Sequence, residues 1–75
     1  MIKDIINNKI YEINVKDGFI HIKNYINISS ISNNKIEVLL KNKTLIVIGS
    51  SLMIRCMDEY ELIINGNIKE IVFNE

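Results

Sequence analysis

The sequence is characterised first by the residue types that it lacks. Its 75 residues include no proline, alanine, glutamine or tryptophan, and only one cysteine and one histidine. Alanine has the highest helix propensity of all residues, so its absence weakens the case for helices. A single cysteine excludes a disulfide within the chain and a metal site built from cysteines alone. Three scattered glycines form no glycine-rich loop of the kind that binds phosphate.

An excess of charge of either sign is also missing. Nine basic and nine acidic residues give a net charge of zero. A nucleic-acid partner is not expected, because binding to phosphates requires a basic surface. No apolar run approaches the roughly 20 residues of a membrane-spanning helix, so direct membrane insertion is not expected either. We expect a soluble cytoplasmic protein.

Isoleucine and asparagine dominate what is present, with eighteen and eleven copies. β-branched isoleucine favours strands, because its restricted side chain packs well on a pleated surface. Apolar and polar residues alternate over Lys9–Lys16, Phe19–Lys23 and Lys35–Leu40, which is typical of half-buried strands. Asp17-Gly18 and Asn65-Gly66 are two-residue turn signals. Together these patterns predict about seven or eight strands of about four to six residues.

One phrase occurs twice in the C-terminal half of the chain. An apolar run, a glycine, a polar interval and a second apolar run make up Thr44–Ile54, and the same order returns in Glu61–Ile71. Glycine supplies backbone freedom that the neighbouring β-branched residues lack. We therefore predict that Gly49 and Gly66 are structural positions that need either a positive φ or a close approach of another backbone segment.

The predicted fold is all-β, with residues 1–75 in a single domain. Closely spaced turns favour a small antiparallel meander that forms a sandwich or roll. A short β-solenoid is the alternative, because Ile20–Ile28 resembles a third, weaker copy of the repeated phrase. The spacings between copies, about 25 and about 17 residues, are uneven for a solenoid, and the meander is preferred.

Six apolar residues are predicted to form an interface. Within each of two short runs the side chains point to both sides of the strand, although a small single sheet cannot cover both of its faces. We expect these faces to meet a second copy or another partner. The alternative is that a second layer of the same domain covers them. The residues are Ile46, Val47, Ile48, Leu62, Ile63 and Ile64.

No residue is predicted to be catalytic, to bind a cofactor or to ligate a metal. His21 has no evident acid or nucleophile near it in sequence and is interpreted as a surface strand residue. Cys56 is interpreted as a buried structural thiol, and Met53 and Met57 beside it as core residues. The acidic segment Asp58–Glu61 is interpreted as a solvated turn. An enzyme would require Cys56 and His21 close together on an exposed surface.

The stretch from Ile20 to Phe73 contains two motifs, Leu45-x-Val47-Ile48-Gly49-x-x-Leu52-x-Ile54 and Leu62-Ile63-Ile64-x-Gly66-x-Ile68-x-x-Ile71-x-Phe73. In these residues it resembles the YabP/YqfC family of sporulation proteins. Asn24 favours the YqfC branch, whereas Lys23 and Tyr25 depart from its pattern, so the choice of branch stays open. The first 18 residues offer little match.

This resemblance implies a non-enzymatic protein of endospore formation that acts in spore assembly. It implies a place in the mother cell, with recruitment to the membrane around the developing spore, and no cofactor. The expected partners are further copies of the chain, a sporulation membrane protein, or both. The alternative is a small β module that recognises a peptide or small ligand in a pocket lined by Tyr25, Tyr60 or His21.

Overall fold

The computed structural model describes residues 11–74, and these residues form strands, turns and no helix. All strands belong to one open antiparallel sheet in the order β1-β2-β6-β5-β4-β3. The prediction of an all-β antiparallel fold is confirmed, and the solenoid alternative is wrong. The strands are β1 (Glu12–Lys16), β2 (Phe19–Lys23), β3 (Asn27–Ile31), β4 (Lys35–Leu40), β5 (Lys43–Met57) and β6 (Glu61–Asn74).

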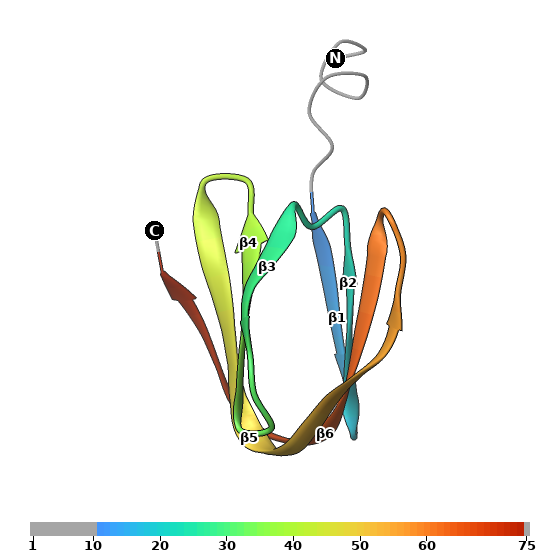
Figure 1. Ribbon diagram of the computed structural model, residues 1–75, viewed down its shortest axis with the longest axis vertical. Coiled ribbons are helices and arrows are strands. Elements are labelled where there is room, and N and C mark those ends of the chain that lie inside the picture. The colour runs from blue at the N-terminus through green and yellow to red at the C-terminus, as the bar shows by residue number, and fades with distance from the viewer. Residues whose placement is uncertain (1–10, 75) are drawn as a thin grey trace, which may run out of the picture.

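Two long strands fold the sheet over on itself. β5 has 15 residues and β6 has 14, and both bend near their middle, so that the sheet has two arms that face each other (Figure 1). Arm 1 contains β1, β2, the first half of β6 and the second half of β5. Arm 2 contains β3, β4, the first half of β5 and the second half of β6. The repeated phrase therefore forms the two strands that both arms share.

The number of strands is smaller than the sequence predicts. The sequence predicts that the segments around Gly49 and Gly66 are turns between separate short strands, but both lie inside continuous long strands. The reason is that β5 and β6 pair with each other from Thr44 opposite Asn74 to Met57 opposite Leu62. Register shifts at the bend absorb the change of direction, as β-bulges do.

The two glycines lie where the bent backbones come closest. Gly66 has a φ of 141°, and a Cβ there would lie 2.7 Å from the carbonyl oxygen of Ser51. At Gly49 a Cβ would collide with the carbonyl oxygen of Asn67. Hydrogen alone fits at both positions, so the bend requires glycine in each strand.

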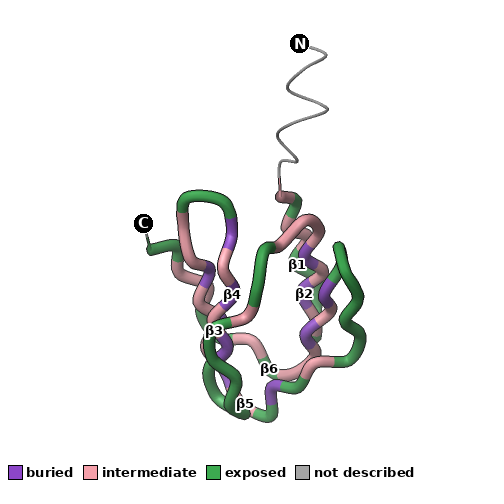
Figure 2. The backbone as a smooth tube through the Cα atoms, turned by 45° about the horizontal axis from the view of Figure 1, so that its top comes forward, coloured by how far each residue is buried: buried purple, intermediate pink, exposed green. Residues whose placement is uncertain are grey.

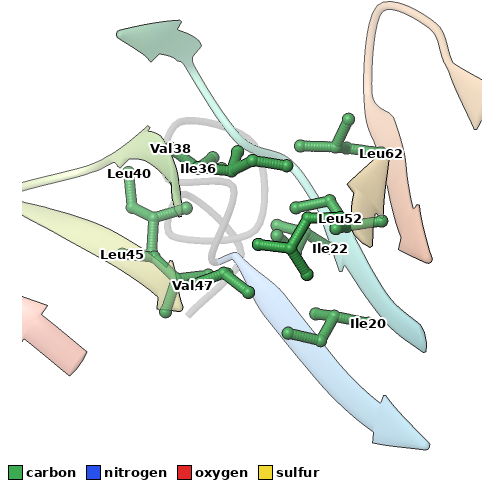
Figure 3. Close-up of a cluster of buried hydrophobic side chains, with 10 residues drawn as sticks. Ile20, Ile22, Ile36, Val38, Leu40, Leu45, Val47, Leu52 and Leu62 are labelled. Carbon is green, nitrogen blue, oxygen red and sulfur yellow. The ribbon is translucent and has the colours of Figure 1, made fainter. Parts of the chain in front are cut away.

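The core lies between the arms. Buried residues alternate with half-buried or exposed residues along β2, β4 and the first halves of β5 and β6, as Figure 2 shows. Side chains from the two arms point toward each other, with Leu52 from the bend of β5 among them (Figure 3). Each contributes about 1.5–3 kcal/mol through burial. The buried residues are Ile20, Ile22, Ile36, Val38, Leu40, Leu45, Val47, Leu52, Leu62 and Ile64.

The connection between β2 and β3 crosses from one arm to the other at the open end of the fold (Figure 1). The amide of Asn24 donates to the carbonyl of Tyr60 in the β5–β6 turn at 2.6 Å. The amide of Ile26 donates to the carbonyl of Leu39 on β4 at 2.8 Å. This crossing therefore ties the two arms together opposite the bend.

Gly49→Ala and Gly49→Val should both destabilise the protein, because even one added carbon meets backbone. We expect the free energy of unfolding to fall by at least about 1–3 kcal/mol, the usual cost of overpacking. Thermal unfolding should show this as a lower midpoint, by about 4–8 °C per kcal/mol for a domain of this size. Ser50→Ala is the control and should stay within about 0.5 kcal/mol of wild type. A Gly49→Val midpoint equal to that of wild type would contradict the close approach.

Candidate functional site

The outer face of arm 2 carries an aliphatic patch. Ile46 lies between Glu37 and Val72 in the register, and Ile48 lies between Lys35 and Glu70. Residues opposite each other on neighbouring strands share a face of the sheet, so these side chains form one surface. All members of the patch are half-buried rather than covered. We define the aliphatic patch as Leu39, Ile46, Ile48 and Val72.

The structure divides the six residues of the predicted interface into two groups. Val47, Leu62 and Ile64 face inward and are fully buried in the core. They cannot contact a partner in this fold, because the opposite arm covers them. The outward-facing residues are Ile46, Ile48 and Ile63, all half-buried.

The outer face of arm 1 brings His21 and Cys56 onto one surface but not together. His21 lies opposite Ile63 on β6, and Ile63 lies opposite Cys56 on β5. Two strand spacings of about 4.8 Å separate the histidine from the cysteine by about 10 Å. His21 Nε2 lies 2.8 Å from Glu61 Oε1 instead. The histidine is therefore partnered by a carboxylate, and a strand stands between it and the thiol.

The interpretation of Cys56, Met53 and Met57 as core residues is wrong. Cys56 is exposed, and the methionines are 59% and 54% exposed. They lie on the second half of β5, which pairs with β6 on one side and with no described strand on the other. Register shifts on both sides of Ile54 interrupt the alternation that suggested burial. Ser50, Ser51 and Arg55 are the sequence signals that this segment leaves the core.

The acidic segment after β5 is an exposed turn that Asp58 organises. Asp58 Oδ1 accepts hydrogen bonds from the amides of Tyr60, at 2.9 Å, and Glu61, at 2.8 Å. These two bonds stabilise the carboxylate and lower the pKa of Asp58.

Tyr25 secures the same turn from the connection between the arms. Its hydroxyl donates to the backbone carbonyl of Asp58 at 2.5 Å. Burial, together with the nearby charge of Asp58, raises the pKa of the Tyr25 phenol. Tyr25 therefore holds a turn, and its hydroxyl is engaged rather than presented to a ligand.

Two further properties concern residues 11–74. No group of three or more histidine, cysteine, aspartate or glutamate side chains in this range is placed to hold a metal ion. Nor does this range contain a helix long and apolar enough to cross a membrane.

Comparisons of the chain with models of protein families, with curated proteins and with solved structures find no match.

Asp58→Asn should remove part of the acid sensitivity of the fold. Because the pKa of Asp58 is lower in the folded protein, its contribution is complete above the ordinary aspartate value of 3.8 and disappears as the pH falls through the folded pKa. We expect the variant to be less stable than wild type at about pH 6 and to approach wild type at about pH 2. Thermal midpoints at both pH values measure this difference.

Glu59→Gln is the matched control, because it removes the adjacent exposed carboxylate. If the difference between Asp58→Asn and wild type were the same at both pH values, the hydrogen-bonded carboxylate would not be the cause.

Proposed function

We propose that this chain is a non-enzymatic interaction protein of endospore formation, which joins copies of itself or a membrane-associated partner during spore assembly. The observation that carries this proposal is the aliphatic patch on the outer face of arm 2. The patch lies on the side of the sheet away from the core, where an antiparallel sheet normally presents polar residues to water.

The arrangement of the patch favours contact with another protein. Ile46 and Val72 are direct neighbours across β5 and β6, so their side chains form one apolar surface rather than isolated residues. Scattered apolar side chains are ordinary on a protein surface, whereas contiguous ones mark interaction sites.

Polar residues surround this apolar centre. Lys35 Nζ and Glu37 Oε2 form an ion pair at 3.3 Å on β4, and Glu70 lies beside Ile48 on β6. An apolar centre with a polar rim is the usual anatomy of a protein–protein interface. The rim would limit which partners fit, since an opposing surface must accommodate both charge signs.

The sporulation role rests on the resemblance to the YabP/YqfC family. The resembling residues, Leu45–Ile54 and Leu62–Phe73, fall on the two bent strands that shape the whole molecule. A protein of this kind would act in the mother cell, at the membrane around the developing spore. Its partners there would be further copies of the chain and a membrane protein of the same assembly.

Ile46→Lys should abolish recruitment without unfolding the chain. We expect the tagged wild-type chain, expressed during sporulation of an endospore-forming bacterium, to concentrate around the developing spore. The variant should remain diffuse, because a charge replaces the centre of the aliphatic patch. Fluorescence microscopy gives the distribution, and the thermal midpoint of the purified variant checks its fold.

Ser30→Lys is the matched control, since it adds the same charge to the outer face of arm 2 at an exposed residue of β3, outside the aliphatic patch. This control should localise like wild type. A wild-type chain that stays diffuse throughout sporulation, or an Ile46→Lys chain that localises normally, would contradict the proposal.

A further inference from the structure

The open sheet leaves four strand segments with an unpaired side among residues 11–74. They are β1, β3, the second half of β5 and the second half of β6. An unpaired strand edge can add a strand from another chain, and proteins prevent this with bulges and charges. The four edges differ in how far they are protected.

Three of the edges are poorly suited to pairing with a copy of themselves. β3 has a register shift between Ile28 and Ser30, and the second half of β5 has shifts on both sides of Ile54. The second half of β6 has a register shift between Ile68 and Glu70, which pair with Gly49 and Ile48, so Lys69 lies outside the ladder with β5. A bulge of this kind disturbs the regular edge that pairing with a second copy needs.

β1 is regular and complementary to itself. It pairs with β2 without interruption, from Glu12 opposite Lys23 to Lys16 opposite Phe19. Its sequence, Glu-Ile-Asn-Val-Lys, places an acid at one end and a base at the other. If a second copy runs antiparallel about Asn14, each Glu12 lies opposite a Lys16.

We infer that two copies of the chain associate by antiparallel pairing of their β1 strands about Asn14. This inference rests on the proposed function and names one mode of its self-association. The pairing joins the two arm 1 sheets into one continuous sheet. It leaves the aliphatic patch, which lies on arm 2, free for a different partner.

On each face of the paired β1 strands, the side chains of the two copies are complementary. On the outer face, Glu12 and Lys16 are exposed and form two opposite-charge pairs, one at each end of the contact. The Nδ2 of Asn14 donates to Glu12 Oε2 at 3.2 Å and so orients this carboxylate. On the inner face, Ile13 lies opposite Val15 of the other copy, which covers a valine that is 55% exposed in the single chain.

The charges also specify the register. Slipping the second strand by two residues places Glu12 opposite Asn14 and leaves the charges without partners. Opposite charges directly across a strand pair stabilise it, and like charges destabilise it. The register centred on Asn14 is therefore favoured over the register shifted by two residues.

Charge reversal tests this contact. Lys16→Glu and Glu12→Lys each place two like-charge pairs in the dimer, and we expect each to raise the dissociation constant at least about tenfold. The double variant, Glu12→Lys with Lys16→Glu, restores opposite pairs and should restore the dimer. Sedimentation equilibrium of the full chain at low salt measures the constants, and circular dichroism confirms the fold.

Lys69→Glu is the matched control, because it makes the same change in net charge at an exposed residue on β6. Its dissociation constant should equal that of wild type. If Lys69→Glu weakened the dimer as much as Lys16→Glu, the effect would be one of net charge and the inference would be wrong.

Cross-linking tests the register directly. Directly opposed residues on antiparallel strands have Cα atoms about 4.5–5.5 Å apart, which is within the range of a disulfide. We expect Asn14→Cys in a Cys56→Ser background to form a disulfide-linked dimer under mild oxidation. Glu12→Cys in the same background should not, because the two copies of residue 12 lie at opposite ends of the pairing.

The possible outcomes separate this inference from the proposed function. A wild-type chain that is monomeric at high concentration overturns the β1 pairing, whereas recruitment around the developing spore would remain to support the function. Phe73 lies on the unpaired half of β6. A dimer that persists in both charge-reversal variants but is lost in Phe73→Lys would form through the β6 edge, and this result would also overturn the β1 pairing. Loss in the single variants, with recovery in the double variant, supports it.

Discussion

The close approach of β5 and β6 at their common bend is the constraint on which the rest of the fold depends. Gly49 and Gly66 admit backbone atoms where any side chain would collide. Because both strands bend at the same place, they remain paired on either side of it and belong to both arms. The arms then face each other, and one sheet supplies both layers of its own core. A 75-residue chain thereby obtains a sandwich without a second sheet.

The fold also explains why the functional proposals concern the outer face and the open edges of the sheet. A strand that passes from one arm to the other faces the core along one side and the solvent along the other. In β5 and β6 the solvent side carries isoleucine and valine at several positions, half-buried by their neighbours. His21 pairs with Glu61, and β6 separates this histidine from Cys56. Apolar outer residues and open strand edges are the features that could bring further chains to this molecule.

Several elements follow directly from particular residues. Asp17-Gly18 forms the turn between β1 and β2, with Gly18 at a φ of 89°. The alternation in Lys35–Leu40 produces a strand whose Ile36, Val38 and Leu40 are buried. The repeated phrase indicates glycines at special backbone positions. Each of these depends on neighbours in sequence, and local propensity and periodicity are sufficient to predict them.

The sequence by itself determined the all-β class, the hairpin turn at Asp17-Gly18 and the importance of Gly49 and Gly66. Only the tertiary structure decided that these glycines lie within strands, that Val47 and Leu62 are covered and Ile46 is not, and that Met53 and Cys56 are exposed. Local periodicity says which residues alternate, but not which side another part of the chain will cover. That side is set by pairing between residues far apart in sequence, such as β2 with β6.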